Sequence, residues 1–114
     1  MSALLAALVL AASSPLTPVG LGMREYRFSV YRPTVHAGRV AFNMTNFGED
    51  AHNLRLSGPG GYRSAVSRDV KPGGHLRFKV HLLRAGSYSL VCLKPEHAAR
   101  GMKAKLRVTR RHQG

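Results

Sequence analysis

The sequence predicts an all-β fold, an antiparallel sandwich or barrel of about seven short strands. Along most of the chain apolar and polar residues alternate with a period of two, as in strands that have one buried face. Turn sequences rich in glycine, proline and asparagine separate these runs, and amphipathic patterns of helix length are hard to find. The 114 residues are enough for one domain and too few for two.

The alternating runs follow one another at the spacing typical of small β-sandwiches and barrels. Strands are predicted within residues 26–31, 40–45, 52–56, 76–82, 88–92 and 102–108. In the clearest run, Leu76, Phe78, Val80 and Leu82 alternate with Arg77, Lys79 and His81. Turns are predicted near residues 37–38, 46–48, 58–61, 71–74 and 85–86.

The chain is strongly basic, with 18 Lys and Arg against 5 Asp and Glu, and a formal charge of +13. A field of this sign favours acidic proteins, anionic lipid head groups or nucleic acid as partners. Basic residues on outward strand positions also keep strand edges soluble, which is an alternative explanation of the charge. Since no aromatic stacking platform is interleaved with the basic residues, we expect no specific binding of nucleic acid.

The chain opens with an apolar run from Ala3 to Ala12, followed by small residues. This pattern predicts a secretory signal or short apolar leader over residues 1–23, with cleavage near residues 11–14, although no Lys or Arg precedes the run. We therefore expect a domain over residues 24–108, a basic disordered tail over residues 109–114, and export to the periplasm, cell surface or extracellular space. A retained membrane tether is the alternative. The single cysteine, Cys92, excludes an intrachain disulfide.

Four side chains that can bind a metal fall on or between the predicted inward faces. His52, Cys92 and Met102 each share the apolar face of their strand, and His97 lies midway between Cys92 and Met102. Two imidazoles, a thiolate and a weak thioether form the ligand set of a blue-copper centre. Zinc is disfavoured, because structural zinc sites use cysteine and histidine without methionine.

These four residues lie in two segments about forty residues apart. Residues 88–102 have the sequence YSLVCLKPEHAARGM, and residues 46–54 have the sequence NFGEDAHNL. The first segment resembles the C-terminal copper loop of the cupredoxin family, type 1 blue copper proteins. Its spacing is closest to the rusticyanin and sulfocyanin type and is also plastocyanin-like. The second segment resembles the first-histidine motif of the same family.

The resemblance implies a Greek-key β-sandwich of about seven to eight strands that binds one copper ion (Cu+/Cu2+) per chain. The implied ligands are His52, Cys92, His97 and, in the axial position, Met102. It further implies that Asn53 steadies the site beside the cysteine sulfur by hydrogen bonding, that Asn46 supports it, and that His97 is the more exposed ligand and the route for electrons.

The implied function is that of an exported one-electron carrier between redox partners, and not of an enzyme. Copper sequestration or delivery is the alternative, because the same ligands would serve. We expect a monomer that meets acidic redox partners, with any membrane contact made only through the leader. Docking is expected through an apolar surface around His97, formed by Pro95, Ala98 and Ala99 and rimmed by Lys94, Arg100 and Lys103.

Glu96 departs from the family pattern, since many relatives have glycine or another uncharged residue at this position. A positive φ there would strain a glutamate backbone. A carboxylate beside His97 would also favour Cu(II) and lower the reduction potential.

Overall fold

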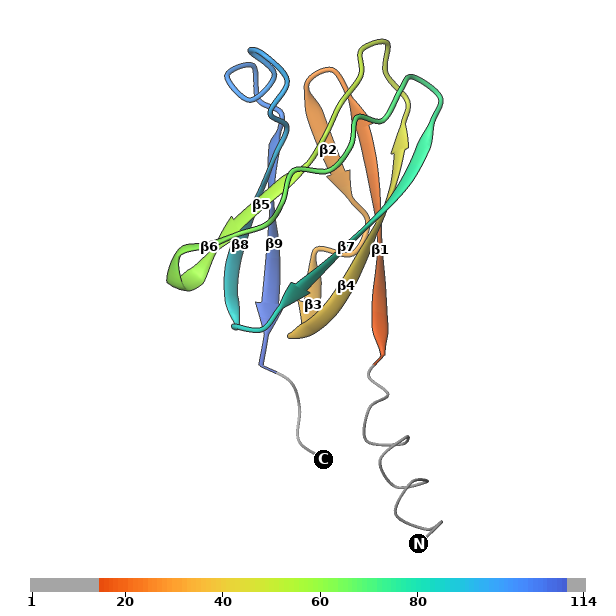
Figure 1. The fold of residues 1–114 in the computed structure, drawn as a ribbon. Helices are drawn as coiled ribbons and strands as arrows, with labels where there is room; N and C mark the ends of the chain where they lie inside the picture. The colour runs from red at the N-terminus through yellow and green to blue at the C-terminus, as the bar shows by residue number, and fades with distance from the viewer. Residues whose placement is uncertain (1–14, 111–114) are drawn as a thin grey trace, which may run out of the picture.

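The computed structural model describes residues 15–110, which form two β-sheets packed face to face (Figure 1). The four-stranded sheet has the order β2-β1-β4-β7. Its strands are β1 (Leu16–Arg24), β2 (Arg27–Val30), β4 (Gly38–Asn46) and β7 (His75–Leu82). The five-stranded sheet has the order β3-β9-β8-β5-β6. Its strands are β3 (Thr34–His36), β5 (Arg55–Gly58), β6 (Tyr62–Arg63), β8 (Gly86–Val91) and β9 (Lys103–Thr109), and one 3-10 turn, η1, spans Pro59–Gly61.

The all-β sandwich is confirmed, but the sheets are mixed rather than wholly antiparallel. Strand β1 pairs with β4 in parallel, and β3 pairs with β9 in parallel. After β1 the chain turns back as β2 and crosses to the other sheet as β3, so that β4 returns beside β1 in the same direction. The described residues form nine strands, slightly more than predicted. Strands β1, β3 and β6 match none of the predicted ranges, and β3 and β6 are too short to show an alternating pattern.

Strand β1 occupies residues that the sequence analysis assigned to the leader. Its side chains Val19, Leu21 and Met23 are fully buried between the sheets, and the strand pairs with β4 along its length. The boundary expected after residue 23 is therefore wrong: the apolar character of this segment reflects burial in the core, and the domain includes Leu16–Arg24. The start of the expected tail is also wrong, because Thr109 is the last residue of β9 and pairs with His36. The expected apolar run and cleavage region in residues 1–14, and residues 111–114 of the expected tail, lie outside the described residues.

The predicted inward faces form the core. Val40, Phe42 and Met44 of β4 are buried against residues of the opposite sheet such as Leu90 and Leu106. Burial of these alternating apolar side chains is the main stabilising contribution to a sandwich of this kind. Within residues 15–110, no helix is both long and apolar enough to span a membrane.

Strand directions bring the two predicted copper motifs to one end of the sandwich. Strand β4 ends at Asn46, β5 begins at Arg55, β8 ends at Val91 and β9 begins at Lys103. The connecting segments 47–54 and 92–102 therefore emerge at the same end, drawn at the top of Figure 1. The pairing of Arg55 with Val91 places His52 and Cys92 on neighbouring strand ends.

Candidate metal centre

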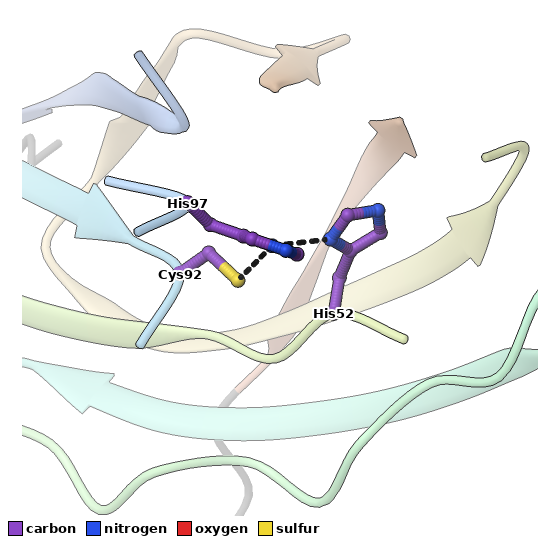
Figure 2. A group of neighbouring side chains, drawn as sticks. All are labelled: His52, Cys92 and His97. Atoms are coloured by element: carbon purple, nitrogen blue, oxygen red, sulfur yellow. Dashed lines mark hydrogen bonds between the residues drawn. The ribbon is translucent and has the colours of Figure 1, made fainter. Parts of the chain in front are cut away.

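His52, Cys92 and His97 form a buried cluster whose nitrogen and sulfur donor atoms all lie within 4.8 Å of one another. The Nδ1 atoms of the two histidines are 3.1 Å apart, and Cys92 Sγ is 3.5 Å from His97 Nδ1. Figure 2 shows the three side chains pointing toward one another, with the His97 ring between the sulfur and the His52 ring. His52 and Cys92 are fully buried, whereas His97 is 8% exposed.

The cluster fits one metal ion. Two protein atoms that each lie about 2.0–2.3 Å from the same ion are separated by roughly 3–4 Å, and the separations of 3.1 Å between the two Nδ1 atoms and 3.5 Å between Cys92 Sγ and His97 Nδ1 fall in this range. Imidazole nitrogen and thiolate sulfur are donors that suit copper in both of its common oxidation states. Two imidazoles and one thiolate are the three strong ligands of a type 1 copper site.

Backbone hydrogen bonds hold the loop residues of the cluster in place. The amide of Met102 donates to the His97 carbonyl at 3.0 Å, and the amide of Cys92 donates to the Met102 carbonyl at 3.2 Å. Met102 is fully buried. The backbone of Met102 is thus hydrogen-bonded to the backbones of both His97 and Cys92.

The segment that carries His52 is tied to residues 67–70. His52 and Val70 exchange two backbone hydrogen bonds, of 3.2 and 2.7 Å. The amide group of the predicted supporting residue Asn46 donates to the carbonyls of Asp50 and Val70, at 2.7 and 2.9 Å, and its Oδ1 accepts from Gly48 N–H at 2.8 Å. Asn46 therefore shapes the turn that leads from β4 to His52.

Asn53 links the histidine segment to the cysteine loop. Its Oδ1 accepts a hydrogen bond from the Leu93 amide, the residue after Cys92, and its Nδ2 lies 3.4 Å from Asp69 Oδ1. It is buried, as a residue with this structural role should be. The sequence analysis expected Asn53 to act near the cysteine sulfur, and its hydrogen bond to Leu93 lies one residue beyond Cys92.

Glu25 is a residue of this site that the sequence analysis missed. Its Oε2 accepts a hydrogen bond from His52 Nε2 at 2.6 Å, and the backbone amides of Glu49 and Asp50 donate to its two oxygens at 2.8 and 3.1 Å. These hydrogen bonds, first of all the one from the Glu49 amide, lower the pKa of the Glu25 carboxyl to about 2. No local pattern marks Glu25, because its contacts join segments 24 to 27 residues apart.

The other histidine, His97, has a more open surrounding. Its Nε2 lies 3.5 Å from Asp50 Oδ2, and that side chain is 53% exposed. The Tyr26 ring meets the His97 ring edge to face at 5.2 Å, and the guanidinium of Arg100 lies over Tyr26 at 5.3 Å. Tyr26 was predicted only as a strand residue, and its contact with His97 arises from the tertiary fold.

The predicted docking residues surround His97 in the loop 93–101 and at the start of β9. Pro95, Ala99, Arg100 and Lys103 are exposed, whereas Lys94 and Ala98 are half-buried. Two of the predicted rim cations are ion-paired: Lys94 with Asp69 at 2.7 Å, and Arg100 with Glu96 at 3.5 Å. The hydrogen bond between Lys94 and Asp69 lowers the pKa of the aspartate and raises that of the lysine.

Glu96 has a φ of +67°, so the backbone at this position is left-handed, as the comparison with glycine-bearing relatives suggested. A non-glycine residue in this region carries steric strain. The strained residue lies directly before His97 and pairs with Arg100, four residues further on.

All five acidic residues of the chain lie around this cluster. Glu25 bonds His52, Asp50 lies beside His97, Asp69 lies beside Asn53, and Glu96 precedes His97. The fifth, Glu49, donates its backbone amide to Glu25. The faces of both sheets, in contrast, carry basic residues without any acidic ones, for example along β7 and β9.

Known structures of blue copper proteins resemble this chain. No family model matches the sequence, and no curated protein matches it. The structure is similar to auracyanin A, described as a "blue" copper protein, from Chloroflexus aurantiacus (TM-score 0.70, 21% identity, covering 83% of this chain and 100% of that chain). It is also similar to rusticyanin from Thiobacillus ferrooxidans (TM-score 0.60, 24% identity, covering 85% of this chain and 79% of that chain). A third similar structure is a multicopper oxidase (TM-score 0.64, 14% identity, covering 83% of this chain and 42% of that chain). The chain thus has the cupredoxin fold, and its His52–Cys92–His97 cluster fits a type 1 copper site.

Proposed function

We propose that this chain is a mononuclear type 1 copper protein that carries single electrons between redox partners. The observation that carries the proposal is the buried cluster of His52, Cys92 and His97, whose donor atoms lie within 4.8 Å of one another. In this proposal Met102 would be the fourth and weaker ligand, which its full burial and its backbone hydrogen bonds to both loop ligands support.

Each residue of the site has a defined task in electron transfer. A bound copper ion would supply a one-electron couple between Cu(I) and Cu(II). The fold holds the donor atoms of the three side chains close together, with His97 Nδ1 3.1 Å from His52 Nδ1 and 3.5 Å from Cys92 Sγ, so little rearrangement is needed when the charge at the site changes. Burial of His52 and Cys92 excludes water, and His97 is the one of the three that reaches the surface. Electrons would therefore enter and leave through the His97 edge.

A carrier is favoured over an enzyme by the same geometry. Catalytic metal sites keep a coordination position open to substrate, whereas the donors of this cluster face one another in the protein interior. The matched multicopper oxidase is a longer chain, of which this chain covers 42%.

Docking is proposed at the surface of the loop 93–101. Its exposed Pro95 and Ala99 offer apolar contact close to His97. Because Lys94 and Arg100 are ion-paired, attraction of an acidic partner would arise mainly from Lys103 and the basic sheet faces. The rate at which an acidic redox protein is reduced should then fall as ionic strength rises, and a rate that does not change with salt would exclude electrostatic steering.

We further propose that the protein is exported and that it is a monomer. The apolar run from Ala3 to Ala12 and the small residues after it support export. Because β1 begins at Leu16, any cleavage has to fall before this residue to leave the sheet intact.

The function is tested by comparing electron transfer with metal transfer. Copper-loaded protein is mixed with a small reductant and oxidant in turn, and separately with a strong chelator for Cu(I) or Cu(II). A carrier cycles reversibly between its two states and keeps its copper in the presence of the chelator over many cycles. Loss of copper to the chelator within the time of one cycle would instead favour the copper-delivery function.

A further inference from the structure

The carboxylate of Glu25 is held in a defined position beside the His52 ring, on the side that faces away from His97. Glu25 lies in the turn between β1 and β2, and its side chain, 23% exposed, reaches across to the loop that carries His52. It accepts three hydrogen bonds, from His52 Nε2 and from the amides of Glu49 and Asp50. The carboxylate therefore has a fixed place and orientation relative to the His52 ring.

The loop is shaped to receive this carboxylate. A Cβ atom at Gly48 would collide with the carboxyl group of Glu25, so a side chain at position 48 is excluded while Glu25 stays in place. The Phe47 amide donates to the Met23 carbonyl at 2.8 Å, which holds the loop against the end of β1. The backbone amide of Gly48 donates a hydrogen bond to Asn46 Oδ1. These contacts fix both sides of the interaction between Glu25 and His52.

The contact determines which nitrogen of His52 carries the proton. An ionised carboxylate only accepts hydrogen bonds, so the nitrogen bonded to it, Nε2, must be the donor. A neutral imidazole protonated at Nε2 has its lone pair on Nδ1, and this is the atom that faces His97 and the cluster. A carboxylate bonded to the outer nitrogen of a histidine ligand also raises the basicity of the ring.

The two histidines of the cluster differ in this respect. The nearest carboxylate oxygen to His97 Nε2, from Asp50, is 3.5 Å away on a side chain that is 53% exposed. Only His52 has a carboxylate at hydrogen-bonding distance within the described part of the chain. The negative charge of Glu25 is thus coupled to the metal centre through one ligand, the more buried one.

We propose that Glu25 is the positioning residue of this copper site: it holds His52 with Nδ1 free to bind the ion, and its charge stabilises Cu(II) relative to Cu(I). The inference rests on the proposed function for its effect on copper, but the hydrogen bond and the protonation of His52 can be measured in the metal-free protein. Substitution of a residue that orients a metal ligand typically lowers metal affinity about 10- to 100-fold.

The test compares Glu25→Gln, which removes the charge and keeps the shape, with Glu49→Gln as a matched control. Glu49 is an exposed acidic residue of the same loop, and its side chain makes no ion pair or hydrogen bond within residues 15–110. Nitrogen NMR of the metal-free proteins reports which ring nitrogen of His52 is protonated. Electrochemistry and metal titration of the copper-loaded proteins report the potential and the affinities.

The expected results differ between the two variants. Metal-free wild type and Glu49→Gln show His52 protonated at Nε2 alone, whereas Glu25→Gln shows a mixture of both tautomers. In Glu25→Gln the affinity for Cu(II) falls at least tenfold more than that for Cu(I), which raises the potential by about 59 mV or more for a one-electron couple. Glu49→Gln changes the potential by a small fraction of this amount.

A third variant, Glu25→Asp, keeps the charge and shortens the reach, so it still tests the inference if Glu25→Gln does not fold. The reduction potential of Glu25→Asp should stay near that of wild type, while its His52 should no longer be protonated at Nε2 alone. The inference is overturned if wild-type His52 is protonated at Nδ1, or if Glu25→Gln matches Glu49→Gln in tautomer and potential. Absence of copper binding by wild type would overturn the proposed function instead, and the tautomer would still report on Glu25.

Discussion

The side-chain oxygen of Asn53 accepts a hydrogen bond of 2.7 Å from the backbone amide of Leu93, 40 residues further along the chain. One of these residues follows the first histidine of the cluster, and the other follows its cysteine. Together with the pairing of Arg55 and Val91, this contact holds the two segments that carry the ligands next to each other.

Asn53→Ala should loosen the metal site and destabilise the fold. Loss of a buried hydrogen bond with one partner left behind costs about 1–3 kcal/mol in the free energy of unfolding. Chemical denaturation of the metal-free protein measures this loss. Asn43→Ala, on the exposed face of β4, serves as the control and should change stability by no more than about 0.5 kcal/mol. Equal effects of the two substitutions would contradict a linking role for Asn53.

Met102→Leu should raise the reduction potential without preventing copper binding. The substitution conserves volume and removes a weak sulfur donor, which leaves a more apolar site that favours the less charged Cu(I). Met44→Leu is the matched control, because Met44 is also buried but belongs to the core face of β4. Electrochemistry of both variants checks the prediction, and an identical potential in the two would exclude Met102 as the axial ligand.

Glu96→Gly should stabilise the protein slightly. The left-handed backbone at Glu96 costs about 1–2 kcal/mol for a residue with a side chain, which exceeds the roughly 0.5–1 kcal/mol that glycine loses in backbone entropy. Thermal denaturation should show a small rise in Tm. The carboxylate is 76% exposed and pairs with Arg100, so its removal should raise the potential by less than Glu25→Gln does.

Glu96→Ala keeps the strain and removes the same charge, and it separates the two effects. A Tm for Glu96→Ala as high as that of Glu96→Gly would show that the charge, and not the backbone, decides the stability at this position.

The ion pair of Asp69 and Lys94 should make a small, pH-dependent contribution to stability. Because the pKa of Asp69 is lowered from 3.8 in the folded protein, the ionised pair stabilises the fold above this pH. The contribution should be lost as the pH falls below 3.8 through the lowered pKa of the folded state. The difference in unfolding free energy between wild type and Asp69→Asn should be complete near neutral pH, small because both side chains are partly exposed to solvent, and absent in strong acid. A difference that persists unchanged into strong acid would contradict this assignment.

The sequence predicts the strands that have a clean alternation and the ligand motifs, because both are local patterns. The inward face of Phe42 and Met44 follows from parity along β4. His52, Cys92 and Met102 are buried as the predicted faces require, although they lie in the segments that adjoin β5, β8 and β9. The left-handed backbone at Glu96 could also be anticipated, because a position that relatives fill with glycine indicates a positive φ.

Strand β1 and Glu25 could not be predicted in this way. The segment Leu16–Arg24 lacks charges before its last residue, as a leader does, and only its pairing with β4 shows that it is a buried strand. Glu25 is one of several charged residues near a turn, and its importance comes from a contact with His52, 27 residues away. Contacts of this length depend on the packing of whole strands, which a local pattern does not contain.

The most direct test of the central claim is a copper titration of the purified metal-free protein, followed by visible absorption spectroscopy. We predict an intense thiolate-to-Cu(II) charge-transfer band that saturates at one copper per chain and is absent from Cys92→Ser. A protein that binds Cu(II) without such a band, or a band of equal intensity in Cys92→Ser, would contradict a copper site built on His52, Cys92 and His97.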